Sequence, residues 1–271
     1  MIQVSKNVFV ENHIRACNLG LIVTKEGIVL IDVPIAPSDA VKWRDEAGKK
    51  GELRYLINTE EHADHCMNSW FYPGVLVSSE QTREKLKTES IDGVIQRVKR
   101  QDPDGLGLLK GFKLRLADIA FTGELKLYLG EQTFHLFTLQ GHSPGGIGVY
   151  LPEERVIFTT DCVFHRVKSW LTEADPNTWL ECLKRIGGLD VDVIVPGHGE
   201  ICKKDYLEEQ SNIIRRWVEA VKSCIEKGWS LEEAMQRISQ PDPYPKQPNT
   251  PMTEDELNRA IVARLYQLYS R

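Results

Sequence analysis

The sequence lacks several features that would mark a protein class at once. Its 271 residues contain no CxxC pair, no apolar run as long as a membrane span and no cluster of basic residues. A disulfide framework, a transmembrane helix and a nucleic-acid surface are therefore poor expectations. We expect a small-molecule substrate, with neither nucleic acid nor a membrane as partner.

The first 20 residues also lack a basic region followed by an apolar core, so they do not read as a signal or transit peptide. The cysteines are scattered, which favours reduced, buried thiols and a cytoplasmic location. They are Cys17, Cys66, Cys162, Cys182, Cys202 and Cys224.

Apolar and charged residues are present in ordinary proportions, at 41% and 27%, with a formal net charge of -5. This composition predicts a globular protein with a sizeable core. Short β-branched runs in the first third predict strands, with a hairpin tip at residues 25–27. Residues 38–50 predict a helix for which Ser38 can serve as N-cap. The order strand, helix, strand indicates an α/β fold.

The same pattern returns later in the chain. Strands are predicted within residues 119–161, a helix at 177–189, and a short buried strand at 192–196 that runs into a glycine-rich loop. Beyond Asp205 the chain reads as helical, with a proline-rich connector before a final amphipathic helix. The repetition suggests a two-fold α/β architecture.

Four polar points come directly after predicted strands. One is NTEEHADHC, residues 58–66; the others are His142, Asp161 and His198. Strands of one sheet end at a common edge, where open α/β folds place their chemistry. Taken alone, His62 and His65 could belong to a polar first helical turn. Together the four points favour a metal centre, because imidazoles and carboxylates are usual ligands of zinc, iron and manganese.

With these motifs in order, the sequence resembles the metallo-β-lactamase-fold superfamily. The family pattern HxHxDH reads Glu60-x-His62-x-Asp64-His65 here, and GHSPGG, FTTD and PGHGE follow at His142, Asp161 and His198. The resemblance implies a four-layer αβ/βα sandwich, to which this chain adds a C-terminal helical extension. It places the catalytic domain at residues 1–204 and the extension, packed on the same domain, at 205–271.

The resemblance also implies two divalent metal ions. One site would take Glu60, His62 and His142. The other would take Asp64, His65 and His198. Asp161 would bridge the two ions, and a water or hydroxide between them would be the nucleophile. Asp64 would also steer that hydroxide or relay a proton.

Glu60 departs from the pattern, since the family usually has a histidine there. Glu60 can be a ligand, it can point away and leave one metal, or the chain can have lost catalysis. We favour the ligand, because three carboxylates, two divalent ions and one hydroxide make a neutral centre. Zinc is the first expectation, and the anionic Glu60 also admits iron or manganese. Glu61 is the alternating neighbour of Glu60, so its side chain is expected to point the other way and to be solvated.

The segment after Asp161 supplies candidate substrate contacts. We expect one of His165, Arg166 or Lys168 to hold an anionic group of the substrate; the alternative is an ordinary solvated loop. Cys162 is expected to pack in the core, and the role of Cys66 is open. The helical extension can form a lid, a homo-oligomer interface or a simple cover over the sandwich.

The leading functional hypothesis is a metal-dependent hydrolase acting on a small ester, thioester, lactone or related substrate. The alternative is an iron-dependent oxidoreductase on the same fold, either persulfide dioxygenase-like or di-iron. A third reading is a binding or scaffold protein with little metal. Elemental analysis and oxygen consumption separate the three.

Overall fold

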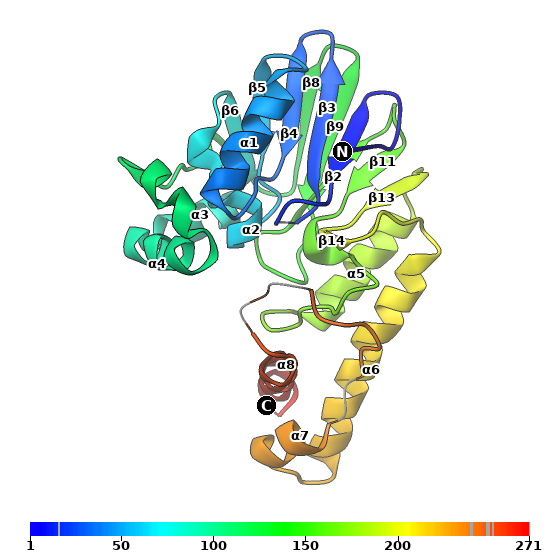
Figure 1. Cartoon of the computed structure of the whole chain (residues 1–271). Helices are drawn as coiled ribbons and strands as arrows, with labels where there is room; N and C mark the ends of the chain where they lie inside the picture. Colours follow the sequence, from blue (N-terminus) through cyan, green and yellow to red (C-terminus); the bar gives the residue numbers. More distant parts are fainter. Residues whose placement is uncertain (16, 239–240, 248–249, 251, 271) are drawn as a thin grey trace.

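Two β-sheets face each other in the computed structural model, which describes residues 1–15, 17–238, 241–247, 250 and 252–270 (Figure 1). The first sheet has seven strands in chain order, antiparallel up to β4 and parallel from there on. Its strands are β1 (Ile2–Gln3), β2 (Val8–Glu11), β3 (Leu19–Thr24), β4 (Gly27–Ile31), β5 (Leu53–Ile57), β6 (Val75–Ser79) and β7 (Ile119–Phe121).

The second sheet has the order β13-β11-β10-β9-β8, and only its β11–β13 pair is parallel. A separate two-stranded pair joins β12 to β14. The strands are β8 (Glu124–Leu129), β9 (Gln132–Thr138), β10 (Ile147–Leu151), β11 (Val156–Phe158), β12 (Phe164–His165), β13 (Val193–Val195) and β14 (His198–Gly199).

Side chains that alternate in direction along each strand contribute to the cores on both faces of the sheet. In β4, Val29 and Ile31 point into the core shared with the second sheet, whereas Ile28 and Leu30 point outward onto Trp43. Successive side chains of a strand face opposite sides, so one strand contributes to two cores. Because both faces are buried, each sheet needs a covering layer of helices.

Helix α1 (Pro37–Gly48) covers the outer face of the first sheet and follows β4 in a parallel crossover to β5, as the sequence predicts. The prediction that Ser38 caps this helix is wrong: Pro37 opens it, and the Ser38 hydroxyl donates to Asp102 at 2.9 Å. The other helices of the first half lie near the same sheet edge. They are α2 (Ala63–Cys66), α3 (Glu80–Lys87) and α4 (Ile91–Gln101).

The second sheet is flanked by helices of the C-terminal half; the last of them packs on the two before it, and together these extend beyond the sandwich (Figure 1). Trp217 and Leu265 are completely buried in one core with Phe137 and Ile157 of that sheet. These buried side chains agree with a covering role for the extension; a lid and a homo-oligomer interface stay predictions. The helices are α5 (Pro176–Gly187), α6 (Tyr206–Glu226), α7 (Leu231–Arg237) and α8 (Glu254–Tyr269).

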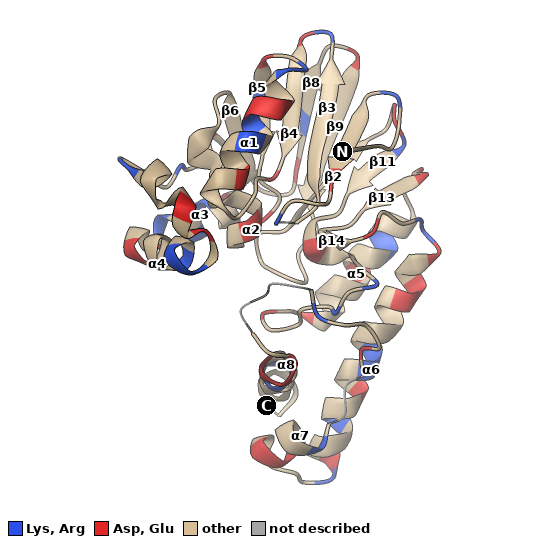
Figure 2. Cartoon of the chain, viewed as in Figure 1, with Lys and Arg blue, Asp and Glu red and all other residues tan. Residues whose placement is uncertain are grey.

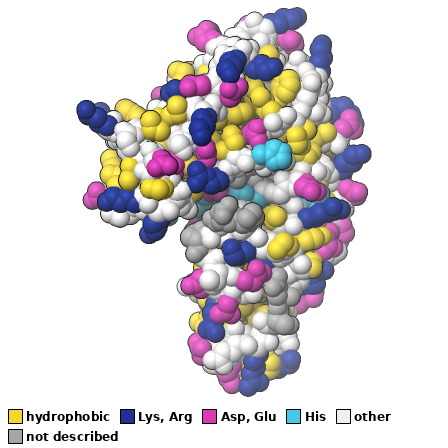
Figure 3. Space-filling model, viewed as in Figure 1, with side chains coloured by type: hydrophobic (Ala, Val, Ile, Leu, Met, Phe, Trp, Pro, Cys, Tyr) yellow, Lys and Arg dark blue, Asp and Glu magenta, His cyan; other side chains and the backbone are white. Residues whose placement is uncertain are grey.

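The αβ/βα sandwich predicted from the sequence is therefore confirmed. No helix in the described ranges is long and apolar enough to cross a membrane. Charges of both signs are interspersed over the helices and strand ends (Figure 2). The surface is hollowed between the sandwich and the C-terminal helices, and histidine side chains show there (Figure 3).

Candidate metal centre

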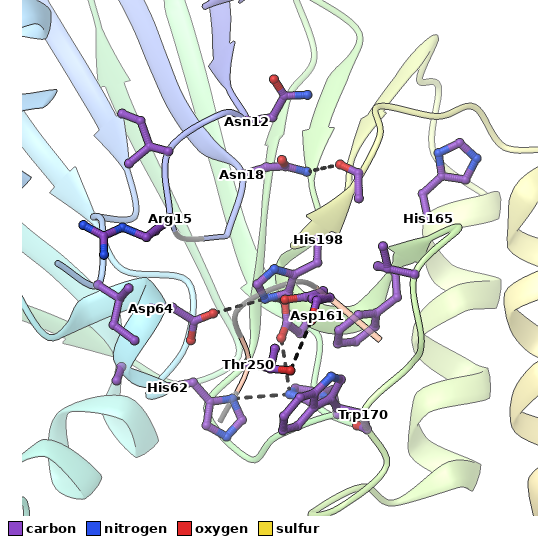
Figure 4. Close-up of a pocket in the computed structure, with 18 of the residues that line it drawn as sticks. Asn12, Arg15, Asn18, His62, Asp64, Asp161, His165, Trp170, His198 and Thr250 are labelled. Atoms are coloured by element: carbon purple, nitrogen blue, oxygen red, sulfur yellow. Dashed lines mark hydrogen bonds and ion pairs between the residues drawn. The ribbon is translucent and has the colours of Figure 1, made fainter. Parts of the chain in front are cut away.

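The four polar points meet at one edge of the sandwich (Figure 4). The 60–65 cluster follows β5 and enters α2, His142 follows β9, Asp161 lies in a short turn after β11, and His198 opens β14. Their ligand-type atoms form two clusters, each within 4.8 Å. One cluster holds Glu60, His62, His142 and Asp161; the other holds Asp64, His65 and His198.

Asp161 lies between the two clusters. Its Oδ1 is 3.4 Å from His65 Nε2 and 3.3 Å from His198 Nε2. Its Oδ2 turns the other way and is 3.5 Å from His142 Nε2. One carboxylate therefore presents an oxygen to each cluster, which is the arrangement that a bridging ligand requires.

Two atoms at this point lack a hydrogen bond, although they lie 3.4 Å from each other as an ion pair. His65 Nε2 and Asp161 Oδ1 are buried and make no hydrogen bond to any described residue. Leaving such groups unpaired is costly, so buried polar atoms nearly always have a partner. Both atoms border the same interior point, and a nitrogen with a carboxylate oxygen is a suitable donor pair for a divalent cation. The residues present thus fit a metal.

Hydrogen bonds at Nδ1 fix the orientation of two imidazoles. His65 Nδ1 lies 2.9 Å from Asp32 Oδ2, and His142 Nδ1 lies 2.7 Å from the Trp170 carbonyl. Such contacts set the tautomer and leave Nε2 as the free ligand atom. Asp32 is itself held by the Thr59 amide and hydroxyl, at 2.7 and 2.6 Å. It stands at the end of β4, so the strand-end argument could have found it from the sequence.

The Glu60 side chain is completely buried and faces the centre. Its Oε1 is 2.5 Å from His62 Nδ1 and 3.8 Å from His142 Nε2, while Oε2 accepts from the Ser143 hydroxyl at 3.1 Å. A carboxylate that points away from the cluster, one of the alternatives for this position, does not agree with these contacts.

Charge balance in the centre is reflected in shifted pKa values. Burial alone would raise the pKa of Glu60, but the imidazoles of His62, His65 and His142 together outweigh it and the net pKa is lowered. Burial opposes a charge on His62, yet the Glu60 carboxylate raises its pKa to about 11. Burial likewise opposes a charge on Asp161, and the His198 and His65 imidazoles hold its pKa well below the usual range. A bound cation would replace the imidazole protons.

Comparison with known proteins decides the family. The family model described as "Metallo-beta-lactamase superfamily" matches residues 14–198. The chain belongs to this superfamily. Its members are generally metal-dependent hydrolases, and the matched segment includes every residue of the two clusters.

Curated relatives are distant. A "Beta-lactamase-like protein 2 homolog" of Caenorhabditis elegans is 22% identical over 182 residues, which are 65% of this chain and 54% of the relative. The "2,4-dinitroanisole O-demethylase subunit alpha" of Nocardioides sp. (strain JS1661) is 24% identical over 184 residues, 64% of this chain and 49% of that protein. The chain thus spans about half the length of these relatives.

Solved structures agree on the fold. A stereoselective inverting sec-alkylsulfatase from Pseudomonas sp. has a TM-score of 0.75 at 15% identity, covering 99% of this chain and 50% of its own. A metallo-beta-lactamase from Pontibacter korlensis has a TM-score of 0.63 at 18% identity, covering 79% and 97%. The match to the sulfatase therefore takes in the C-terminal helices as well as the superfamily sandwich.

The expectation that Glu61 is solvated is wrong. Its side chain is buried and accepts hydrogen bonds from the Gly145 amide at 3.1 Å and the Ser143 hydroxyl at 3.2 Å. The period-two alternation assumed for this residue does not apply, since β5 ends at Ile57. Glu61 instead fastens the glycine-rich loop that carries His142. A side chain at position 145 would overlap the Glu61 carboxylate.

Neither neighbouring cysteine faces the centre. Cys162 is buried in the core beneath the second sheet, as expected. Cys66 is also buried, and its thiol donates to the carbonyls of Glu61 and His62 at 3.3 and 3.2 Å. Burial raises the pKa of both thiols well above the ordinary value. Both are neutral packing groups.

The structure places the three proposed substrate-contact residues in different environments. The prediction for Lys168 is wrong, because it is completely buried and pairs with Glu254 and Asn258 of α8, partners that local sequence cannot reveal. His165 and Arg166 do border the pocket. The His165 ring packs on Tyr206 at 4.5 Å and is turned away from Asp161 (Figure 4). For these two residues a substrate contact stays a prediction.

The centre forms the floor of a cavity of about 1130 Å³. Its walls come from the loop before β3, the end of α4, the segment after β12 and two residues of the C-terminal connector, Gln247 and Thr250. The sequence placed Trp170 at the pocket mouth but gave no sign that its carbonyl contacts His142, and it missed Glu173, whose Oε1 lies 4.0 Å from His62 Nε2. The cavity has room for a small organic substrate above the centre.

Proposed function

We propose that this chain is a hydrolase with a two-metal centre, acting on a small ester, thioester, lactone or related substrate. One observation carries the proposal: two buried atoms without a hydrogen bond, His65 Nε2 and Asp161 Oδ1, border one point at the floor of an open cavity. Such a site combines metal-binding groups with access for a substrate, and the superfamily supplies the general reaction class.

The residues divide into two ligand sets. Glu60, His62 and His142 would hold one ion; Asp64, His65 and His198 would hold the other; and Asp161 would lie between them. When bound, the ions supply Lewis acidity and lower the pKa of a bound water. Asp32 and the Trp170 carbonyl hold the imidazoles of His65 and His142 in the orientation that presents Nε2 to the centre.

Asp64 has a second role in the proposal. Its side chain is partly exposed to the cavity, and its Oδ2 lies 3.2 Å from His198 Nε2. Burial would raise the pKa of Asp64, but the hydrogen bond from His198 and the charges of His65 and His198 together lower it. As an ionised carboxylate it can accept a hydrogen bond from the attacking water and orient it.

Two relatives bear on the substrate class. One is named for O-demethylation of 2,4-dinitroanisole and another for cleavage of secondary alkyl sulfates. Both names describe release of an oxygen-linked group from a small organic molecule. They support, for this chain, cleavage of a small ester-like bond. All six cysteines are buried free thiols, and we infer the reducing cytoplasm as its location.

Elemental analysis combined with a substrate panel tests the proposal. The panel contains ester, thioester, lactone, β-lactam, phosphodiester and sulfate ester substrates, and it compares wild type with Asp64→Asn. We expect bound divalent metal and turnover of at least one ester-like substrate. Asp64→Asn should lower kcat by roughly 100-fold. Full activity in Asp64→Asn would remove the proposed centre.

An iron-dependent oxidoreductase is the second candidate, and Glu60 favours it. A buried carboxylate in place of an imidazole makes the first ligand set harder, which suits iron or manganese as well as zinc. Protein loaded anaerobically with iron should consume oxygen with a persulfide or similar reductant if this candidate is right. Iron-loaded protein that hydrolyses esters and consumes no oxygen would decide for the hydrolase.

A further inference from the structure

Four arginines line the cavity, and two of them are already neutralised. Arg15 contacts Asp39, with Nε 3.1 Å from Oδ2, and also donates to the Gln101 carbonyl. Arg166 lies 3.8 Å from Glu200. Arginines engaged in this way have part of their charge and donors occupied by the protein itself. The cationic character of the cavity therefore depends on the other two.

Arg97 and Arg100 are these two, and both come from α4. They are three residues apart, so they lie on neighbouring positions of one helix face. Neither makes an ion pair or a hydrogen bond to a side chain or carbonyl in the part of the chain that the structure describes. An adjoining face of α4 packs Val94 and Val98 against Met67 and Phe112, which fixes the helix at the cavity wall.

Arg97 carries the sharper signal. Its Nη1 is buried and has no hydrogen-bond partner among the described residues. A guanidinium has only donors, so this atom requires an acceptor, and an oxyanion is the best match. Arg100 stands one turn further along and can share the same anion.

The carboxylates of the cavity do not supply that acceptor. Asp64 and Asp161 contact the histidines of the centre, with His198 next to both. Glu173 Oε1 lies 4.0 Å from His62 Nε2, and Glu200 lies 3.8 Å from Arg166. Each acidic group is thus matched elsewhere, and α4 is left with uncompensated positive charge inside the cavity.

We propose that Arg97 and Arg100 form a subsite for an anionic group of the substrate, remote from the bond that is cleaved. The substrate would then be a small ester-like molecule that carries a carboxylate, sulfonate or phosphate at its other end. A planar guanidinium pair binds such oxyanions with two parallel hydrogen bonds. This inference rests on the proposed hydrolase and names its substrate class.

Monomethyl and dimethyl esters of dicarboxylic acids test the subsite. Monomethyl succinate, adipate and suberate carry a carboxylate at increasing distance from the ester, and the dimethyl esters lack it. Hydrolysis takes up one water and releases methanol with the acid. We expect wild type to prefer at least one monoester over its diester by roughly tenfold or more in kcat/KM. A terminal sulfonate in the same series distinguishes the type of anion.

The variants are R97Q, R100Q and the double change, with K99Q as matched control. Lys99 lies on the same helix, is exposed and does not line the cavity, so K99Q removes the same charge elsewhere. The double variant should lose the preference through a higher KM for the monoester, and turnover of the diester should stay unchanged. K99Q should behave as wild type.

Calorimetric titration with adipate and suberate gives a readout that does not need turnover. Binding that is present in wild type and K99Q but lost in the double variant supports the subsite, even if no ester is hydrolysed. In that case the hydrolase fails and the subsite stands. Equal kcat/KM for every monoester and diester pair, or dicarboxylate binding that is unchanged in the double variant, overturns the subsite.

Discussion

At the scale of single residues, two adjacent glutamates serve different purposes. Glu60 points its carboxylate at His62 and His142, whereas Glu61 holds the Gly145 amide and the Ser143 hydroxyl. Both are buried, so exposure does not distinguish them. Their contacts do, and the two residues form a natural test pair.

We expect Glu60→Gln to reduce bound metal from about two ions to about one per chain, because a neutral amide is a weak ligand. Glu60→His should keep both ions. Metal content of purified protein, measured by elemental analysis, provides the check.

Glu61→Gln is the control for this pair. The amide oxygen can still accept from Gly145, so metal content should match wild type. Full metal content in Glu60→Gln would show that Glu60 is not a ligand.

Gly197 sets a second limit at this scale. A Cβ at this position would overlap Asp161 Oδ1 and the backbone of Thr160 and Asp161. Gly197→Ala should displace the central carboxylate and weaken metal binding by roughly 10–100-fold, measured with a competing chelator. Gly187→Ala is the comparison, because its Cβ would meet nothing closer than 3.8 Å. Equal metal affinity in both variants would contradict the central place of Asp161.

At the scale of elements, the C-terminal helix α8 is attached through a buried cation. Lys168 follows β12, is completely buried, and contacts Glu254 and Asn258 of α8. The connector before α8 is tied to the same segment, since the Pro245 carbonyl accepts from the Lys168 amide at 2.8 Å. These contacts hold the connector at the edge of the cavity.

Lys168→Ala should destabilise the protein by about 1–3 kcal/mol. The loss is smaller than for a fully buried pair, because the Glu254 side chain is 42% exposed and water screens it. Urea unfolding measures the change in free energy. Lys126→Ala on the exposed side of β8 is the reference and should change stability by less than about 0.5 kcal/mol. Equal stability of the two variants would show that the Lys168 contacts do not hold α8 in place.

The elements themselves were largely readable from the sequence. Alternation and turn residues predicted the first strands, the α1 crossover and the helical tail. The errors lie where an element ends or where the partner is distant. Glu61 was judged by strand alternation beyond the end of β5, and Gly145, its partner, lies 84 residues away. Lys168 meets a glutamate 86 residues downstream. Neither separation leaves a local signal.

At the scale of the whole molecule, the buried histidines make stability depend on pH. His62 and His198 have folded pKa values raised to about 11 and about 9, mainly because carboxylates outweigh their burial. A raised pKa contributes stability that is fully present below the unfolded value of about 6.5 and is lost as pH rises through the folded pKa. The Asp64 and Asp161 carboxyls, with lowered pKa values, act in the opposite sense in acid.

We therefore expect the Tm of chelator-treated protein to fall as pH rises from about 6.5 to about 9. Added zinc should stabilise more strongly over the same range, because a cation binds deprotonated imidazole. Thermal unfolding with EDTA and with zinc, across a pH series, measures both trends. A Tm that rises with pH in EDTA would contradict the charge arrangement described for the centre.

The candidate centre was predictable as a set because its members follow strands in a recognisable order. The cavity above the centre was not predictable from the sequence. Arg97 and Arg100 lie in a segment that reads only as a polar helix, and nothing in its periodicity says which face meets a cavity. The placement of α4 depends on Val94 and Val98 packing with Met67 and Phe112, which lie outside the helix.

The cavity wall has one further consequence. The ligand-type residues all fall between positions 60 and 198, whereas Gln247 and Thr250 in the connector contribute to the wall. Part of the substrate-facing wall is thus encoded outside the stretch that carries the ligand-type residues. Insertions or exchanges around Gln247 and Thr250 can change which molecules fit the cavity. The ligand-type residues between positions 60 and 198 then stay the same. Related proteins can thus differ in substrate specificity through changes in the connector while they keep the same ligand-type residues.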